Sequence, residues 1–154
     1  MNSTTDPRKF PFPPGIPISA WLLGWALGAI WPVPFHWQGW MRPVGGILMA
    51  LAVSIAAWAV ATFRRHGTQV DPLGKVSTIV SSGPYRVTRN PMYLSLMVLY
   101  CGGILAFHLA WSVALLPVVF LALHYGVIVR EERYLRANFG EPYAEYCRQV
   151  RRWL

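Results

Sequence analysis

Two clusters of polar residues, which we call cassettes, carry side chains that could bind a cationic, flat and polar ligand. The first cassette is Gly83-Pro84-Tyr85-Arg86-Val87-Thr88-Arg89-Asn90-Pro91-Met92-Tyr93. The second is Arg130-Glu131-Glu132-Arg133-Tyr134-Leu135, with the following Phe139-Gly140, Tyr143 and Tyr146. Tyrosine rings can hold a sulfonium or stack on a purine, carboxylates can bind an ammonium group, and arginines can bind a carboxylate.

The paired carboxylates Glu131 and Glu132 are the most unusual feature of the second cassette. They lie at or just beyond the expected edge of the lipid, where an unpaired charge is costly and usually functional. The alternative is a surface network in which arginines at helical spacing neutralise them, namely Arg130, Arg133 and Arg136. That alternative leaves the first cassette unexplained.

The stretch between the cassettes, residues 92–129, contains no formally charged side chain. Its length is close to twice the roughly 20 residues that a helix needs to cross a bilayer. It therefore predicts a hairpin of two spans, with a turn near residues 107–111, which returns both cassettes to one membrane face. One further span is expected within residues 10–41, around the apolar run 16–33, and another at 44–63. The sequence predicts an all-α polytopic membrane protein with four transmembrane helices.

Basic residues are distributed very unevenly around these spans. Of the 14 Lys and Arg residues, all but Arg42 precede the first span, lie between the second and third, or follow the fourth. Cytoplasmic loops carry such an excess, so both termini and both cassettes are predicted to be cytoplasmic, in a bacterial inner membrane. Anionic lipid then explains the net charge of +8, and no nucleic-acid partner is expected.

The whole chain, residues 1–154, is interpreted as one domain. Closely spaced prolines predict an extended arm at 1–17, residues 18–129 hold the spans and a long loop between helices 2 and 3, and residues 130–154 form cytoplasmic helices. Phe139-Gly140 is the expected stop between those helices, and Pro142 opens the last one. We expect the loop and the C-terminal helices to build a cofactor pocket.

Small residues recur at helical spacing in the first two spans, at Gly24, Gly28, Gly45, Gly46, Ala50 and Ser54. Small side chains let membrane helices approach closely, so these positions predict helix contacts rather than a site. The sequence has no Cys/His cluster with metal-ligand spacing, and no metal is expected. A disulfide is not expected either, because Cys101 lies in the third span and Cys147 in the cytoplasmic part.

The cassettes resemble the motifs of integral-membrane methyltransferases of the isoprenylcysteine carboxyl methyltransferase type, which include small prokaryotic members and the related phospholipid N-methyltransferases. The pattern Gly-x-Tyr-x-x-x-Arg-His-Pro-x-Tyr is present as Gly83, Tyr85, Arg89, Asn90, Pro91 and Tyr93. The pattern Glu-Glu-x-x-Leu, then Phe-Gly-x-x-Tyr-x-x-Tyr, is present as Glu131, Glu132, Leu135, Phe139, Gly140, Tyr143 and Tyr146. The resemblance covers roughly residues 67–152.

This resemblance implies that S-adenosyl-L-methionine (SAM) binds between the cassettes, without a Rossmann fold. The residues implied to contact this cofactor are Ser77, Thr78, Ile79, Val80, Tyr85, Asn90, Pro91, Met92, Tyr93 and Glu131. Glu131 would hold the amino group of SAM through a charge-assisted bond worth about 1.5–3 kcal/mol. The implied reaction is methyl transfer at the cytoplasmic membrane face to a small lipophilic acceptor, which arrives from the surrounding membrane lipids.

Two positions depart from the pattern of the family. Asn90 replaces the usual His, and an amide can still donate and accept hydrogen bonds. In the isoprenylcysteine enzymes, an Arg one helical turn before the first Glu binds the substrate carboxylate, and here that position is Val127. The second departure leaves SAM binding in place but turns the prediction away from a prenylcysteine substrate.

The catalytic residues stay unassigned, with His124 and Arg89 as candidates. A carboxylate acceptor needs no general base, whereas an amine or hydroxyl must lose a proton, for which His124 is the nearest group. Two other functions remain open. A membrane reductase with a nicotinamide cofactor is disfavoured by the paired carboxylates, because its phosphates would need several cations. The other is a non-enzymatic membrane protein with vestigial cassettes.

Overall fold

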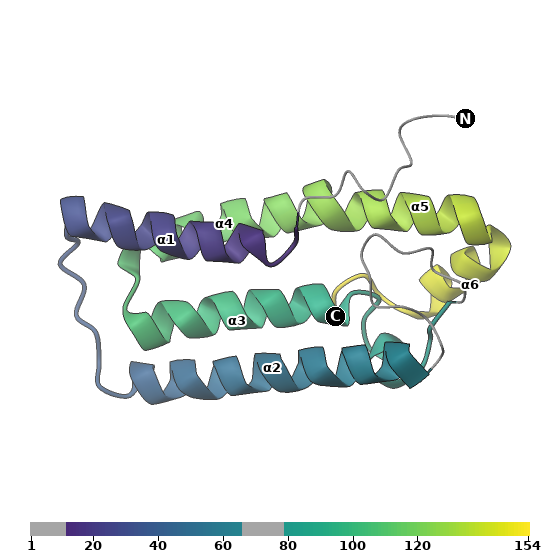
Figure 1. Ribbon diagram of the computed structural model, residues 1–154, viewed down its shortest axis with the longest axis horizontal. Coiled ribbons are helices and arrows are strands. Elements are labelled where there is room, and N and C mark those ends of the chain that lie inside the picture. Colours follow the sequence, from purple (N-terminus) through teal and green to yellow (C-terminus); the bar gives the residue numbers. More distant parts are fainter. Residues whose placement is uncertain (1–11, 66–78) are drawn as a thin grey trace.

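The computed structural model describes residues 12–65 and 79–154, and in these ranges the chain is helical without β-strands. The elements are α1 (Gly15–Ile30), α2 (Met41–Arg65), the 3-10 helix η2 (Gly83–Arg86), α3 (Pro91–Phe107), α4 (Ala110–Leu123), the π-helical turn η3 (His124–Ile128), α5 (Val129–Phe139) and α6 (Glu141–Gln149). Figure 1 shows the long helices lying side by side along one axis. The all-α prediction is confirmed.

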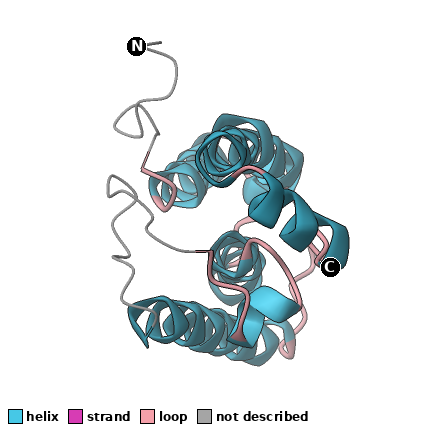
Figure 2. Cartoon of the chain, turned by 90° about the vertical axis from the view of Figure 1, so that its right-hand side faces the viewer, coloured by secondary structure: helices cyan, strands magenta, loops and turns pink. Residues whose placement is uncertain are grey.

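The helices form two closely packed pairs, α2 with α3 and α1 with α4. The end of α2, the start of α3, α5, α6 and the C-terminus gather at one end of the molecule (Figures 1 and 2). The predicted turn between the third and fourth helices is confirmed at the other end. There, α3 ends at Phe107, His108 adopts the left-handed conformation with φ 56°, and α4 begins at Ala110.

Two helices are long and apolar enough to cross a bilayer: α2, and the continuous helix 110–139 formed by α4, η3 and α5. Both reach a mean hydropathy of 2.2, yet only 17% and 28% of their most apolar stretches are buried inside the protein. Apolar surface of this extent indicates contact with lipid. Helices α1 and α3 are also apolar, with 16 and 17 residues, which is shorter than a full span of about 20.

The first helix begins earlier than the sequence predicted. α1 starts at Gly15, with Pro14 as its N-cap and Pro17 buried in its first turn. Proline is tolerated there because the first backbone N–H groups of a helix have no intrahelical partner. The prediction of an extended arm up to residue 17 is therefore wrong at its C-terminal end, and residues 1–11 lie outside the described part.

The main core lies between α3 and the helix 110–139. It consists of buried side chains from both helices, namely Tyr100, Ile104, Val119, Leu123 and Val127. Trp21 of α1 covers it by stacking on Tyr100, with ring centroids 5.9 Å apart, and donates an indole N–H to the Tyr100 carbonyl at 3.2 Å. This core fixes α3 against the helix that carries the second cassette.

The turn η3 joins α4 to α5 without a break, so the apolar helix continues directly into the second cassette (Figure 1). Single π-helical turns inside α-helices occur frequently at functional sites. The predicted continuation through Arg136 is confirmed, and α5 ends at Phe139. Gly140 adopts φ 56° and Pro142 lies in the first turn of α6, as the sequence predicted.

The predicted helix contacts at small residues are confirmed at some positions only. A Cβ on Gly45 would lie 2.4 Å from the Ala106 backbone nitrogen and 2.6 Å from the Gly102 carbonyl oxygen, so α2 and α3 touch backbone to backbone there. Gly24 is equally close to Ser112 of α4. In contrast, a Cβ on Gly46 would meet nothing within 4 Å.

Gly45→Val is therefore expected to lower the free energy of unfolding by at least about 2 kcal/mol, because the helix pair cannot separate without losing its packing. Gly46→Val is the matched control, since it adds the same side chain one residue away in open space. The thermal unfolding midpoint in detergent measures both. Equal midpoints for the two variants would contradict the close α2–α3 contact.

Candidate functional site

The first cassette follows a tight turn on the end of α2. Gly83 has φ 58°, a region that favours glycine, and a Cβ there would lie 2.8 Å from Thr62 Oγ1. This turn presses Tyr85 against Phe63, with ring centroids 5.3 Å apart. Tyr85 is buried together with Val80, so the start of the cassette is anchored by an apolar cluster.

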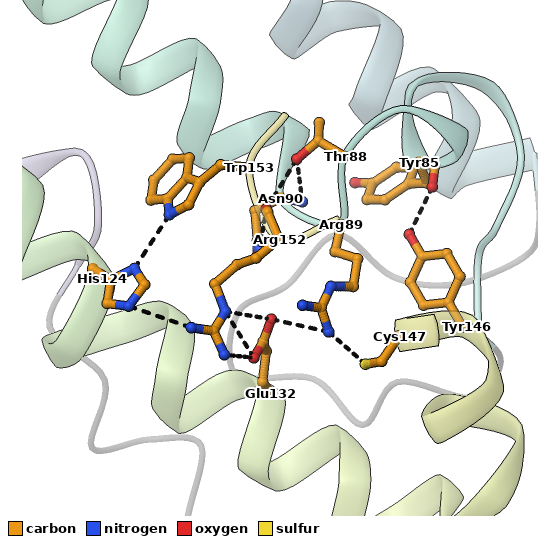
Figure 3. A network of polar contacts seen from close by, with 10 residues as sticks. All are labelled: Tyr85, Thr88, Arg89, Asn90, His124, Glu132, Tyr146, Cys147, Arg152 and Trp153. Carbon is orange, nitrogen blue, oxygen red and sulfur yellow. Dashed lines mark hydrogen bonds and ion pairs between the residues drawn. The ribbon is translucent and has the colours of Figure 1, made fainter. Parts of the chain in front are cut away.

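Helix α6 folds back over this turn, as the pattern of its tyrosines predicted. Tyr143 and Tyr146 are both buried, and the Tyr146 hydroxyl donates to the Tyr85 carbonyl at 2.7 Å (Figure 3). The two cassettes are therefore in direct contact through a hydrogen bond between residues that are 61 positions apart.

Burial sets the protonation of these phenols. Desolvation raises the pKa of Tyr85 and of Tyr143 above the ordinary value for tyrosine, and it raises the pKa of Tyr146 to about 12. The nearby carboxylates act in the same direction, Glu131 on Tyr85 and Glu132 on Tyr143. All three hydroxyls are protonated at neutral pH and can act as hydrogen-bond donors.

The first carboxylate of the pair, Glu131, is held by the first turns of α3. The Tyr93 hydroxyl donates to Glu131 Oε2 at 2.6 Å, a short charge-assisted bond. Within residues 12–65 and 79–154, no Lys or Arg forms an ion pair with Glu131. The described part of the chain thus orients this carboxylate without neutralising it.

The second carboxylate, Glu132, lies in a dense network of cations (Figure 3). It is 6% exposed and accepts from Arg152 at both oxygens, Nη2 to Oε2 at 2.7 Å and Nε to each at 3.1 Å. Arg89 reaches Glu132 Oε1 at 3.5 Å and also donates to the Cys147 sulfur. The bond to Glu132 raises the pKa of Arg152 above its ordinary value.

The chain after α6, residues 150–154, runs along the first cassette, and we call it the tail. The Arg89 backbone N–H donates to the Arg151 carbonyl at 2.9 Å. The Arg152 carbonyl accepts from Thr88 Oγ1 at 3.0 Å and from Asn90 Nδ2 at 2.9 Å. These bonds join the tail to the segment that enters α3.

His124, the candidate general base, also faces the tail. Trp153 Nε1 donates to His124 Nδ1 at 3.2 Å, and Arg152 Nη1 approaches His124 Nε2 at 3.4 Å. A neutral imidazole has one nitrogen that can accept, so two donors compete for a single lone pair. Protonation of the ring would set a second cation against Arg152.

The structure brings most of the predicted cofactor residues to one end of the molecule. Val80, Tyr85, Asn90 and Pro91 are buried, Met92 packs on the cluster of Val80 and Tyr85, and Ile79 precedes it. Ser77 and Thr78 lie outside the described residues. Asn90 uses its amide on the tail, and Arg89 uses its guanidinium on Glu132, as given above.

The alternative network of α5 arginines is wrong for Glu132. In the described ranges its cations are Arg152 and Arg89, and none of the arginines at helical spacing forms an ion pair with either carboxylate. Sequence reasoning missed Arg152, Trp153 and Thr88 as parts of the site, because it counted the tail arginines only as markers of the cytoplasmic side. The one available signal was Glu132 itself, since a buried carboxylate requires a partner.

Comparison with known proteins gives a family match and two relatives. A sequence model of the phospholipid methyltransferase family matches residues 40–142, which is more than half of the chain. A cobalt-zinc-cadmium resistance protein of Cupriavidus metallidurans is 32% identical over 121 residues, 75% of this chain and 51% of that protein. An uncharacterised protein of Haemophilus influenzae is 42% identical over 65 residues, 41% of this chain and 100% of that protein.

The chain thus spans about half the length of the first of these relatives. No solved structure matches this chain.

Proposed function

Because the chain belongs to the phospholipid methyltransferase family, we propose that it transfers the methyl group of SAM to a small lipophilic acceptor at the cytoplasmic face of the membrane. The observation that carries this proposal is Glu131, a carboxylate that Tyr93 orients and that no described Lys or Arg neutralises. Such a group suits the ammonium of the methionine part of SAM.

The residues around Glu131 fit the rest of the cofactor. Tyr85 and Tyr93 are neutral aromatic side chains beside this carboxylate, and tyrosine faces attract a sulfonium. SAM supplies an activated methyl group on its sulfur. The protein would hold the acceptor in line with that group, since positioning is the main requirement of such a displacement. Ser77, Thr78, Ile79, Val80, Asn90, Pro91 and Met92 complete the proposed cofactor site.

Val127 supports an acceptor other than prenylcysteine. Its side chain is 2% exposed and belongs to the apolar core of α3 and the helix 110–139. It therefore provides no cation for a substrate carboxylate. An amine or hydroxyl acceptor would pass its proton to His124, whose single lone pair would have to be released by Trp153 or Arg152. We propose that the acceptor enters from the bilayer between the helices.

We also propose four transmembrane helices, with both termini in the cytoplasm of a bacterial inner membrane. The two shorter apolar helices run beside the two that are long enough to span, α1 beside α4 and α3 beside α2. The basic excess at the end that carries the cassettes supports the orientation. Anionic membrane lipids are the natural partners of that basic surface.

The reductase alternative is weakened by the ion pairs of Glu132. A nicotinamide cofactor carries phosphates that need cations, but Arg89 and Arg152 are both directed at Glu132. Using them for phosphates would leave a buried carboxylate unpaired, which is costly. A non-enzymatic membrane protein remains the other alternative, and ligand binding separates it from an enzyme.

Purified protein in detergent is expected to bind S-adenosylhomocysteine, the demethylated product of SAM, and not NADPH. Isothermal titration calorimetry measures both, and a thermal unfolding curve shows that the protein is folded. Binding of NADPH alone would favour the reductase, and binding of neither ligand by folded protein would refute the enzyme. With radiolabelled SAM, a total lipid extract should become labelled, whereas robust labelling of a prenylcysteine analogue would refute the proposed acceptor class.

A further inference from the structure

We propose that Arg152 is a positioning residue that holds the two halves of the cofactor site together, a role that rests on the proposed function. Its guanidinium grips Glu132 in the second cassette, and its carbonyl accepts from Thr88 and Asn90 in the first. One tail residue thus bridges both cassettes (Figure 3). It lies beyond residues 40–142, the part of the chain that the family match covers.

The side chain of Arg152 fixes the rotation of α5. Its planar fork bonds both oxygens of Glu132, at 2.7 and 3.1 Å, and a two-point contact restrains orientation as well as distance. Glu131 is the next residue toward the N-terminus on the same helix. Holding Glu132 toward the tail therefore keeps Glu131 turned toward Tyr93, where the 2.6 Å bond is observed.

The main chain of Arg152 fixes the start of α3. Asn90 is the N-cap position of that helix, and its side-chain amide donates to the Arg152 carbonyl at 2.9 Å. Tyr93 lies in the first turn that follows. Both partners of the Tyr93–Glu131 bond are thus close in sequence to a residue that Arg152 holds, and the two contacts set their separation.

Arg152 also decides which carboxylate stays available. With Arg89 it places two positive charges next to Glu132, while Glu131 receives only a phenol from the described residues. An incoming ammonium group is therefore attracted to Glu131 and repelled from Glu132. Removing Arg152 would create a second, competing carboxylate one residue away and would loosen the first.

The test is a double-mutant cycle in the full-length protein with Arg152→Gln, Glu132→Gln and the double variant. Breaking a buried pair on one side is strongly destabilising, whereas removing both charges is often nearly neutral. We expect the unfolding midpoint to fall in each single variant and to recover in the double variant. The dissociation constant for S-adenosylhomocysteine should stay raised in the double variant by roughly 10-fold, the lower end of what loss of supporting residues costs in metal sites.

Arg148→Gln is the matched control, because Arg148 lies four residues earlier and pairs only with exposed Glu141 and Glu145 among the described residues. It should leave both readouts unchanged. A double variant that has the wild-type midpoint and also the wild-type dissociation constant would overturn the positioning role. If the neutral variants do not fold, Arg152→Lys decides, since it keeps the charge but loses the fork: a severalfold weaker affinity is expected, and wild-type affinity overturns the role.

The two proposals fail in different ways. If the wild-type protein is folded but does not bind S-adenosylhomocysteine, the proposed function and the cofactor role of Arg152 are both refuted, although the coupling between the midpoints would still show the ion pair. If the wild type binds and the double variant binds equally well, only the role of Arg152 is refuted.

Discussion

Glu131→Gln is expected to weaken S-adenosylhomocysteine binding by about 100-fold while leaving the unfolding midpoint close to that of the wild type. The charge-assisted bond to the ammonium is worth up to about 3 kcal/mol, and each 1.4 kcal/mol is tenfold in affinity. The protein itself loses little, because Tyr93 can still donate to the amide oxygen of Gln at position 131. Titration calorimetry and a thermal melt measure the two quantities.

Glu132→Gln serves as the matched partner, since it makes the same change one residue along α5. Here the main loss is stability, about 3 kcal/mol or more, because Arg89 and Arg152 keep their charges in a largely buried place without a counter-charge. Its effect on affinity should be smaller than that of Glu131→Gln. If both variants bound S-adenosylhomocysteine as tightly as the wild type, Glu131 could not be the ammonium ligand.

Gly83→Ala is expected to cost the second largest amount of stability outside the carboxylate pair. Position 83 has φ 58°, where a residue with a Cβ pays about 1–2 kcal/mol. The new Cβ would also meet Thr62 Oγ1 at 2.8 Å and its methyl group at 3.3 Å, and such overpacking typically adds 1–3 kcal/mol. The thermal midpoint should fall, and the first cassette should lose its fixed place on α2.

Gly140→Ala separates the two contributions. Gly140 has a similar φ of 56°, but a Cβ there would meet nothing within 4 Å. It should therefore show the conformational cost alone, and the difference between the two variants measures the crowding at Thr62. A larger loss at Gly140 than at Gly83 would contradict the close contact of the turn with α2.

The sequence was sufficient for features that depend on local pattern. The absence of charge over residues 92–129 predicted a helical hairpin, and the observed turn at His108 lies where it was expected. The stop at Gly140 and the start of α6 near Pro142 follow from the backbone preferences of glycine and proline. That the cassettes meet also follows from the hairpin, since its two ends must lie at the same end of the molecule.

Features that depend on distant parts of the chain could not be predicted. The nearest cations to Glu132 in sequence are on α5, but the direction of each side chain around that helix sends them elsewhere, and the carboxylate pairs with Arg152 instead. Only the path of the tail after α6 determines this choice, and no periodicity encodes it. The π-helical turn η3 likewise leaves no mark in the hydrophobic pattern, because all of residues 125–129 are uncharged.

That turn makes chain length a stricter requirement here than residue identity. An α-helix advances about 100° and 1.5 Å per residue, so deleting one residue from His124–Ile128 would restore a regular helix but swing everything beyond it by more than a quarter of a circle. Glu132 would leave the tail and Glu131 would leave Tyr93 together, although every side chain of the site was still present. Substitutions within 124–128 are thus compatible with the site, whereas a deletion or an insertion is not. The link at residues 31–40, at the far end of the molecule, carries no such restriction on its length.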